Sequence, residues 1–370
     1  MSVLEKLNLG IVGACKRGGS YARAVGHVGK ARVHAVCDVD AVHLPEAAVR
    51  MGAEEAYTDY CEMLARSEVD AVILGTPMYL HASQAVAALR QGVHVLSEVT
   101  AGVSLEECRQ LVAACRASSA TYMMAENYVY SRQNVLVREL VRRGWFGDTY
   151  YAEGEYLHEL KPLNEATPWR RVWQTGVDGI TYGTHSLGPI LQWMPGDRVT
   201  SVCCAGSGHH YRDVRGVAYE NQDSCVMLCA MRSGGLVKVR VDMLSDRPHA
   251  MTNYQLQGSD GCYESARAPG ERDRVWLRAH APDAQSWADL SAFDDLLPEE
   301  YRALCGPAEE SGHGGGDFFV LHAFVNALVR GSPPPIGIHE AMDMTLPGLV
   351  SQQSIREGAC WLAVPDSRDW

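Results

Sequence analysis

The chain has 370 residues, of which 46% are hydrophobic and 21% charged, and its formal net charge is −12. This length exceeds that of one ordinary hydrophobic core, so we expect two domains in a soluble globular protein. Phosphate-binding surfaces are basic, so the negative charge argues against nucleic acid as a main partner. No apolar stretch approaches the roughly 20 residues that cross a bilayer, so we expect no membrane-spanning segment.

The twelve cysteines and the start of the chain bear on the cellular compartment. The cysteines form no Cys-x-x-Cys pair, and most lie within apolar stretches, where cysteine behaves as a small core residue. The first residues, MSVLEKLNLGIVG, pass almost directly into a strand pattern and leave no room for a signal peptide. We therefore expect reduced thiols in a cytoplasmic protein.

The first third of the chain alternates between strand-like and helical stretches. Apolar runs of strand length lie at residues 7–12, 32–40, 69–77, 93–98 and 121–127, and helical stretches at 80–92 and 104–118. The run from Ala71 to Gly75 carries no charge, as expected of a strand buried on both faces. Gly92 is typical of a helix C-terminus, and Ser104 with Glu107 has the spacing of a capping box. This alternation predicts a parallel sheet with right-handed crossovers.

The pattern changes after about residue 145. Strand-like segments then follow one another closely, at residues 148–160, 198–206, 223–244, 253–265 and 274–280. RSGG at 232–235 is typical of a hairpin turn, and 316–331 has helical spacing and could pack on either domain. We predict an α/β Rossmann domain over residues 1–127 and an α+β domain over 128–370 with an open, mainly antiparallel sheet.

A glycine-rich stretch, Gly13-Ala14-Cys15-Lys16-Arg17-Gly18, follows the first apolar run. It fits G-x-G-x-x-G between a strand and a helix, with Cys15 in place of the middle glycine. Gly13 permits a tight turn and Gly18 a close approach of helix to sheet, while backbone N–H groups at the helix start can hold a pyrophosphate. A purely structural turn is the alternative, and the Cys15 side chain weakens the motif.

An aspartate in the expected place supports dinucleotide binding. Asp38 ends the second apolar run, where a carboxylate accepts hydrogen bonds from the adenosine ribose and repels a 2′-phosphate. The competing interpretation is a surface aspartate that terminates a strand. The order of the two elements favours a dinucleotide, and Asp38 favours NAD over NADP, although Arg17 or Arg32 could weaken that preference.

The stretch DGITYGTHSLGPILQW, residues 178–193, contains candidate proton-transfer residues. His185 titrates near neutral pH and suits general acid and base catalysis. Tyr182 lies three residues earlier, so both rings share one face if the stretch is helical. Gly188-Pro189 is expected to break or bend the chain just beyond them. The alternative is a core histidine bonded to backbone, with the tyrosine in packing.

The stretch VDAVILGTPMYLHASQAVAALRQGVHVLSE resembles the third-to-fourth strand region of the Gfo/Idh/MocA oxidoreductases, and the resemblance covers nearly the whole chain. It implies a Rossmann domain followed by a domain with an open antiparallel sheet. It also implies that Thr76, Pro77 and His81 lie along the cofactor, with Glu98 near the nicotinamide ribose. Asn127 would lie close to the nicotinamide.

The residue after Glu98 departs from the family's dehydrogenases. There a lysine follows the glutamate and relays a proton from the reacting hydroxyl, whereas Val99 cannot carry a proton. The set AEN, GEYLHEL, WR, DG, Y-x-TH-x-LGP and HGG-x-DF is most similar to the NAD-dependent glycosidase branch, typified by α-N-acetylgalactosaminidases. In that branch the lysine is commonly absent, and tyrosines and a histidine of the second domain replace it.

The branch resemblance implies a reaction. NAD⁺ takes a hydride from C3 of a sugar, the C2 proton and C1 substituent are lost, water adds, and the hydride returns. His185 then handles the 3-hydroxyl proton, and Tyr156 is the C2 base or leaving-group acid, with Tyr182 in support. Lys161 or Arg170 would lower the pKa of Tyr156.

The same resemblance suggests substrate contacts. Glu126 matches a substrate-site carboxylate, and His313 with Asp317 could form a substrate-clamping loop because the glycines around them permit close approach. Trp169 could stack on a sugar face beside Arg170. The alternatives are a flexible connector at residues 309–317 and simple burial of the tryptophan.

Several hypotheses remain open at this point. A NAD-dependent enzyme that cleaves a sugar glycoside leads, with net dehydrogenation of a sugar or cyclitol hydroxyl as the alternative. A cofactor-binding regulatory protein without catalysis is the third. His209, His210 and Asp213 are metal-ligand types, but we expect a solvated loop there and no metal. By analogy, the chain forms a homodimer or homotetramer.

Overall fold

The computed structural model describes residues 6–281 and 283–370. The chain folds into two compact units. The first unit comprises Met1–Tyr130, Ala303–Met342 and Ser367–Trp370. The second comprises Ser131–Arg302 and Asp343–Asp366. Residues 303–342, near the end of the sequence, therefore belong to the same unit as its beginning.

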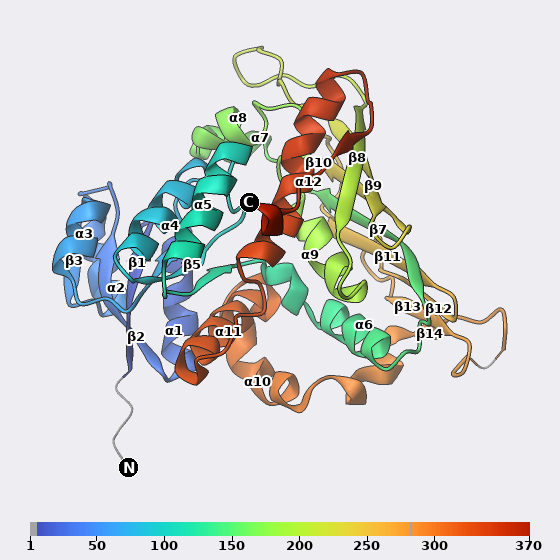
Figure 1. The fold of residues 1–370 in the computed structure, drawn as a ribbon, viewed down its shortest axis with the longest axis horizontal. Coiled ribbons are helices and arrows are strands. Elements are labelled where there is room, and N and C mark those ends of the chain that lie inside the picture. The colour runs from blue at the N-terminus through green and yellow to red at the C-terminus, as the bar shows by residue number, and fades with distance from the viewer. Residues whose placement is uncertain (1–5, 282) are drawn as a thin grey trace. The chain divides into compact units, whose positions relative to one another are not determined.

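The first unit is built on a six-stranded parallel sheet in the order β3-β2-β1-β4-β5-β6 (Figure 1). The strands are β1 (Leu7–Val12), β2 (Ala31–Cys37), β3 (Glu55–Tyr57), β4 (Ala71–Leu74), β5 (His94–Ser97) and β6 (Tyr122–Met124). Its helices include α1 (Ala22–Val28), α2 (Leu44–Met51), α3 (Tyr60–Arg66), α4 (His81–Arg90), α5 (Leu105–Ala117) and α11 (Gly316–Arg330). The predicted Rossmann fold is confirmed.

Local sequence signals explain several boundaries in this unit. All four residues of β4 are buried, as the uncharged run predicted. The Ser104 hydroxyl accepts from the Glu107 N–H, while the Glu107 carboxylate accepts from the Val103 N–H, so α5 begins in a capping-box arrangement. Gly92 follows α4 with φ 77°, a conformation that favours glycine.

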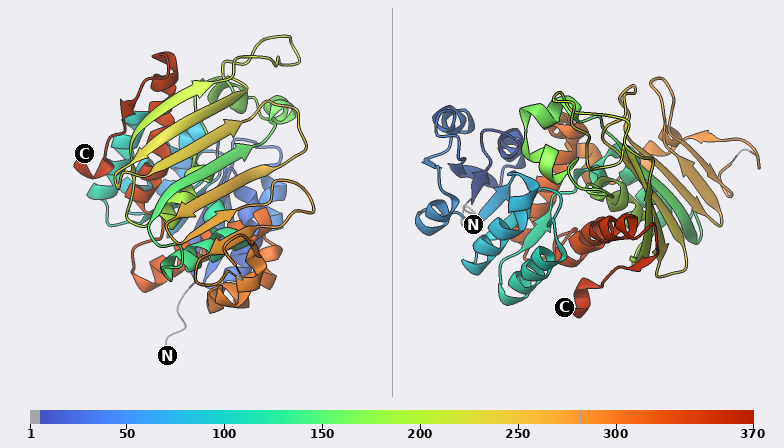
Figure 2. Two further views of the ribbon diagram at one scale, coloured as in Figure 1. Left: turned by 90° about the vertical axis from the view of Figure 1, so that its right-hand side faces the viewer. Right: turned by 90° about the horizontal axis from the view of Figure 1, so that it is seen from above.

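The second unit is built on a nine-stranded mixed sheet in the order β14-β13-β12-β11-β7-β10-β9-β8-β15. The strands are β7 (Thr149–Leu157), β8 (Val199–Gly206), β9 (Ser224–Met231), β10 (Leu236–Asp242), β11 (Met251–Gly258), β12 (Gly261–Glu264), β13 (Arg274–Leu277), β14 (Ala288–Asp289) and β15 (Leu362–Ala363). Only β7 and β10 pair in parallel among these strands, so the sheet is mainly antiparallel, as predicted. Figure 2 (left) looks onto one face of it.

The predicted hairpin is present in this sheet. β9 and β10 pair across the Arg232–Gly235 turn. The remaining helices are α6 (Arg132–Arg142), α7 (Lys161–Ala166), α8 (Trp169–Trp173), α9 (Thr184–Trp193), α10 (Glu299–Glu309) and α12 (Ile338–Arg356). A Cβ on Gly154 of β7 would lie 2.8 Å from the Ser186 Cβ, so glycine lets α9 pack directly on the sheet. Within the described residues, no helix is long and apolar enough to cross a membrane.

The expected break at Gly188-Pro189 is wrong, because α9 continues through Pro189 to Trp193. Proline has no N–H, so the carbonyl of His185, four residues earlier, loses its usual helical partner. The Tyr254 hydroxyl donates to that carbonyl at 2.5 Å. A tyrosine from β11 thus satisfies the acceptor that Pro189 leaves, and the helix stays intact.

Candidate active site

The glycine-rich turn after β1 is tightly packed. Gly13 has φ 77°, and a Cβ there would lie 2.6 Å from the Gly75 carbonyl oxygen. A Cβ on Gly18 would lie 2.4 Å from the Val12 carbonyl oxygen. Both positions therefore require glycine, which is the feature that a dinucleotide-binding turn needs to bring backbone close to a pyrophosphate.

Cys15 and Asp38 complete this turn. The Cys15 N–H donates to Asp38 Oδ2 at 2.8 Å, and the Asp40 N–H donates to Oδ1 at 3.0 Å. Burial, and then the charge of Asp38, raise the pKa of the Cys15 thiol to about 11, so the thiol is neutral at pH 7. A carboxylate has about four acceptor sites, so Asp38 retains capacity for ribose hydroxyls while it holds the turn.

The segment after β4 contains Thr76 and Pro77 and leads to His81, the first residue of α4. The His81 ring is buried between the carbonyl oxygens of Thr76, at 2.8 Å, and Thr100, at 3.0 Å. Burial lowers the pKa of His81 despite these two carbonyls. His81 therefore ties the loops after β4 and β5 together, while Thr76 and Pro77 keep part of their surface exposed.

The Arg17 guanidinium contacts a cluster of acidic and polar side chains of the first unit. Its Nη2 lies 2.7 Å from Glu98 Oε1, and the Tyr21 hydroxyl donates to the same oxygen at 2.5 Å. Burial, and then the charge of Glu98, raise the pKa of Tyr21 well above its ordinary value, so Tyr21 remains a donor. We predicted a cofactor contact for Arg17; the structure shows its guanidinium held by protein carboxylates.

Asp317, in the first turn of α11, is the centre of this cluster. It is completely buried and receives Arg17 Nη1 at 2.7 Å and Nη2 at 2.8 Å. The Asn127 amide donates to it at 3.0 Å, and His313 Nδ1 lies 2.9 Å away. Burial acts to raise the pKa of Asp317, but the hydrogen bonds from Arg17 and His313 lower it well below 3.8. We refer to Arg17, Tyr21, Glu98, Asn127, His313 and Asp317 as the Asp317 cluster.

The glycine-rich loop before α11 is wrapped around Asp317. Residues 312–315 all have positive φ. A Cβ on Gly312 would lie 3.2 Å from the Asp317 carboxylate, and a Cβ on Gly316 would lie 2.8 Å from the Asn127 carbonyl oxygen. The glycines thus allow the chain to close around a buried carboxylate. Glu126, the predicted substrate-site carboxylate, is also fully buried and accepts from the Tyr128 N–H at 3.2 Å.

The three predicted catalytic rings come together in the second unit. Tyr156 ends β7, Tyr182 precedes α9, and His185 lies in its first turn. The ring centroid of Tyr156 lies 5.3 Å from those of both Tyr182 and His185. The centroids of Tyr182 and His185 are 4.9 Å apart, in an edge-to-face contact. Two phenols and an imidazole therefore share one site, as expected.

His158 joins this group and was not among the predicted catalytic residues. Its Nδ1 lies 2.8 Å from the Tyr156 hydroxyl, and its ring meets His249 edge to face at 5.4 Å. We refer to Tyr156, His158, Tyr182, His185 and His249 as the ring cluster. The i, i+2 spacing of Tyr156 and His158 on a strand could have revealed this pair, because such residues share a face.

The cations predicted to act on Tyr156 have other partners. Lys161 Nζ donates to the Leu244 carbonyl and to Asp246, both at 2.6 Å. Arg170 donates to the Gln174 side chain at 2.9 Å, and its guanidinium carbon lies 4.4 Å from the Trp169 ring centroid. A hydrogen bond joins the Tyr156 hydroxyl to His158.

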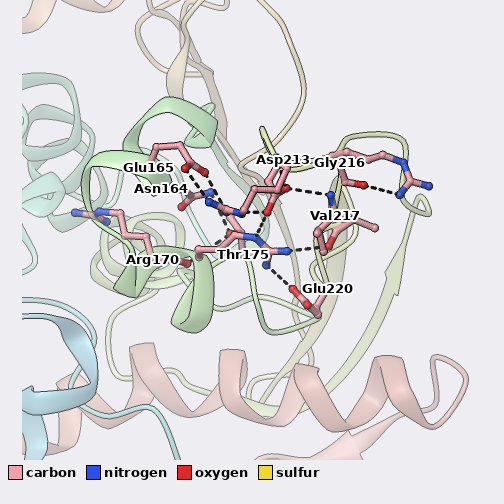
Figure 3. Close-up of polar contacts among 12 residues, drawn as sticks. Asn164, Glu165, Arg170, Thr175, Asp213, Gly216, Val217 and Glu220 are labelled. Carbon is pink, nitrogen blue, oxygen red and sulfur yellow. Dashed lines mark hydrogen bonds and ion pairs between the residues drawn. The ribbon is translucent and has the colours of Figure 1, made fainter.

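Helix α8, which carries Trp169 and Arg170, is anchored by Arg171. This arginine donates to the Ala218 carbonyl at 2.8 Å and to Glu220 at 2.5 Å, and contacts Asp213 at 3.5 Å. Figure 3 shows these acceptors on the loop between β8 and β9, with the Arg170 guanidinium directed away from them. The loop thereby anchors α8 through Arg171.

The loop at residues 207–223 does not gather metal ligands. Asp213 is bound by Arg215 at 2.8 Å and by main-chain N–H groups, and His210 Nδ1 lies 2.5 Å from Asp223. Among residues 6–281 and 283–370, no group of three or more His, Cys, Asp or Glu side chains could hold a metal ion.

Comparisons with known proteins identify the family. Residues 7–126 match the oxidoreductase family with an NAD-binding Rossmann fold, and residues 130–369 match the C-terminal domain of glycosyl hydrolase 109. A glycosyl hydrolase family 109 protein of Saccharopolyspora erythraea is 31% identical over 98% of this chain and 83% of its own length. The chain belongs to glycosyl hydrolase family 109.

Other relatives agree with this assignment. The α-N-acetylgalactosaminidase of Shewanella oneidensis is 29% identical, and the match covers 98% of this chain and 85% of that protein. Among solved structures, levoglucosan dehydrogenase with NADH and levoglucosan has a TM-score of 0.81 at 18% identity, covering 98% of this chain and 100% of its own. The WlbA dehydrogenase of Bordetella pertussis with NADH and UDP-GlcNAcA has a TM-score of 0.80 at 22% identity, covering 98% of both chains. These structures share the fold.

The glycosyl hydrolase 109 assignment confirms the predicted family and its cofactor. NAD is the cofactor of the first unit, and the geometry of Gly13, Gly18 and Asp38 fits it. Val99, at the position of the usual dehydrogenase lysine, is 3% exposed and belongs to the core. This member of the family therefore is an NAD-dependent enzyme without a lysine beside Glu98.

Proposed function

We propose that the protein hydrolyses a glycoside through transient oxidation at C3 of the sugar, with an α-N-acetylgalactosaminide as the first substrate to test. The observation that carries the proposal is the ring cluster, which places two phenols and an imidazole within one site. The name of the Shewanella oneidensis relative and the buried Val99 support it. In this proposal Trp169, Arg170 and His313 bind the sugar, and Glu126, which is fully buried, is not assigned a direct contact.

The cofactor site is assigned to the first unit. We propose that the turn from Gly13 to Gly18 holds the pyrophosphate, that Asp38 binds the adenosine ribose, and that Glu98 binds the nicotinamide ribose. We also propose that Thr76, Pro77 and Asn127 contact the cofactor between these points. His81 holds the loops after β4 and β5 in place through Thr76 and Thr100. Bound NAD supplies a hydride acceptor for the sugar carbon and returns the hydride at the end of the cycle.

The side chains of the ring cluster move the protons. His185 removes the proton of the 3-hydroxyl group during oxidation and returns it during reduction. The 3-ketone acidifies the hydrogen on C2, which Tyr156 removes as the C1 substituent leaves, with Tyr182 in support. Tyr156 must pass its own proton on before it acts as a base, and His158, hydrogen-bonded to its hydroxyl, is the group that receives it. Addition of water across C1 and C2 completes hydrolysis.

The decisive experiment measures turnover and redox state together. Purified protein that retains NAD should release p-nitrophenol from a p-nitrophenyl glycoside without added NAD⁺ and without net absorbance change at the NADH band. Steady NADH formation with free sugars would instead show net dehydrogenation. Unchanged properties of His185→Ala and Tyr156→Phe would show a non-catalytic cofactor-binding protein.

We also propose a cytoplasmic homodimer or homotetramer that does not bind nucleic acid or membranes. The cysteines include no Cys-x-x-Cys pair, which supports reduced thiols, and the net charge of −12 opposes a polyanionic partner. Light scattering coupled to size-exclusion chromatography measures the oligomeric state; a monomer mass would contradict the assembly.

A further inference from the structure

We infer that Asp317 is a positioning residue for NAD, acting through Arg17 on Glu98. The inference rests on the proposed contact of Glu98 with the nicotinamide ribose, but not on the glycosidase reaction. It gives a role in cofactor binding to the buried Asp317 carboxylate, which has no role in the proposed reaction.

The contacts of Asp317 exclude a direct substrate role. Its side chain has no exposed surface. Oδ1 accepts from Arg17 and Asn127, and Oδ2 accepts from Arg17 and lies beside His313 Nδ1. These three residues make four contacts, which occupy the roughly four acceptor sites of a carboxylate, so no site is left for a sugar hydroxyl.

The Arg17 guanidinium connects this carboxylate to Glu98. Its two terminal nitrogens meet the two Asp317 oxygens in a fork, which fixes the plane of the group. With that plane fixed, Nη2 forms an ion pair with Glu98 Oε1 at 2.7 Å. The Tyr21 hydroxyl donates to the same oxygen, so both of these contacts meet Glu98 at Oε1, and we assign Oε2 to the ligand.

Loss of the fork would change what Arg17 does to Glu98. A guanidinium released from Asp317 can form the same two-pronged pair with Glu98, because carboxylates of Asp and Glu match its geometry equally. Both Glu98 oxygens would then face an arginine instead of a ribose diol. Asp317 therefore prevents Arg17 from pairing with both oxygens of Glu98, so that Glu98 can bind the ribose.

The test is the dissociation constant of NAD, measured by calorimetry on full-length protein stripped of cofactor. Asp317→Asn keeps the size of the side chain and removes its charge, and we expect NAD binding to weaken about 10- to 100-fold, the range known for residues that orient a ligand-binding group. Asp213→Asn is the matched control, since this carboxylate is also held by arginines but lies in the second unit, and its NAD affinity should equal that of the wild type.

A double-mutant cycle separates positioning from general damage. If Asp317 acts through Glu98, adding Asp317→Asn to Glu98→Gln should weaken NAD binding less than twofold further. Fully additive losses, or unchanged affinity in Asp317→Asn, would overturn the inference. Should Asp317→Asn not fold, Arg17→Lys tests the same link, because an ammonium group cannot form the fork; unchanged NAD affinity in it overturns the inference equally.

The outcomes also distinguish this inference from the proposals beneath it. Unchanged NAD affinity in Glu98→Gln removes the Glu98 contact and the inference together. Weakened binding in Glu98→Gln with normal binding in Asp317→Asn removes the inference alone. If NAD affinity falls as expected in both variants but the wild type does not hydrolyse glycosides, the inference stands and the glycosidase proposal is refuted.

Discussion

The Asp317 cluster and the ring cluster solve the same problem, the exact placing of a few side chains, by opposite means. The first pairs two carboxylates with an arginine whose side chain is 25% exposed, matching charge with charge. The second brings rings together in edge-to-face contacts and includes a hydrogen bond between a phenol and an imidazole. Ion pairs suit groups that must keep their charge, whereas the rings are the groups to which we assign proton transfer.

The largest expected effect is a loss of catalysis, without loss of NAD binding, in variants of the ring cluster. His185→Ala and Tyr156→Phe each remove a proton-transfer group, so we expect kcat/KM for the glycoside to fall roughly 100- to 10,000-fold. NAD affinity should stay within twofold of wild type, because both residues belong to the second unit. Steady-state kinetics and calorimetry check the two quantities, and a parallel loss of NAD binding would contradict the division.

The buried charges of the Asp317 cluster should dominate stability. Asp317→Asn leaves Arg17 without one partner of a buried pair, and we expect a loss of about 3–5 kcal/mol in the free energy of unfolding at pH 7. The folded-state pKa of Asp317 is lowered below 3.8, so its stabilisation is present above that pH and is lost as pH falls toward the folded value.

Denaturant unfolding of wild type and variant from pH 7 to pH 3 measures this dependence. The difference between the two proteins should shrink below pH 3.8. A difference that stays constant across this range would show that the Asp317 charge does not stabilise the fold.

A smaller effect should appear at His158. His158→Gln removes the proton acceptor beside Tyr156, and we expect about a tenfold loss of kcat, at the low end of acid-base effects. The same substitution in a Tyr156→Phe background should change kcat less than twofold, because the relay is already broken. Independent losses in the double variant would contradict a shared proton path.

Tyr254→Phe should lower the stability of the fold. The variant removes the hydroxyl that donates to the buried His185 carbonyl beside Pro189, which we expect to cost about 1–3 kcal/mol of unfolding free energy. Thermal unfolding measures it, with Tyr263→Phe, a buried tyrosine of the same sheet, for comparison. Equal stability of Tyr254→Phe and wild type would show that the carbonyl has found another partner.

The smallest effect belongs to the exposed part of the Asp213 network. Arg215 pairs with Glu165 in a largely solvated position, with 56% of the arginine side chain exposed. Glu165→Gln breaks this pair and leaves the contact of Arg215 with Asp213 in place, so it should reduce the free energy of unfolding by less than about 1 kcal/mol, and added salt should remove the difference. A loss comparable with that of Asp317→Asn would overturn the contrast between solvated and buried pairs.

The sequence predicted what depends on neighbouring residues. The uncharged run at β4, the Ser104 capping box and the β9–β10 hairpin follow from local pattern, and each is present. Strand β3, Glu55–Tyr57, was not predicted, because three residues without an apolar run give no periodic signal. The intact α9 depends on Tyr254, a distant residue that no local rule connects to Pro189.

The candidate site was predicted unevenly for the same reason. Tyr182 and His185 lie three residues apart, so their contact could be anticipated. The Arg17–Asp317 pair joins residues 300 positions apart, and each residue alone was compatible with a cofactor or substrate contact. Only the folded chain shows that they bind each other.

The return of α11 to the first unit has a consequence for synthesis on the ribosome. When residues 1–130 have emerged, Arg17 and Glu98 are present, but the helix that carries Asp317 is still untranslated. A truncated chain that ends before residue 303 would contain the whole glycine-rich turn and yet lack the partner that orders it. If Asp317 positions NAD as we infer, tight binding of the nucleotide requires a chain that has been translated almost to its end.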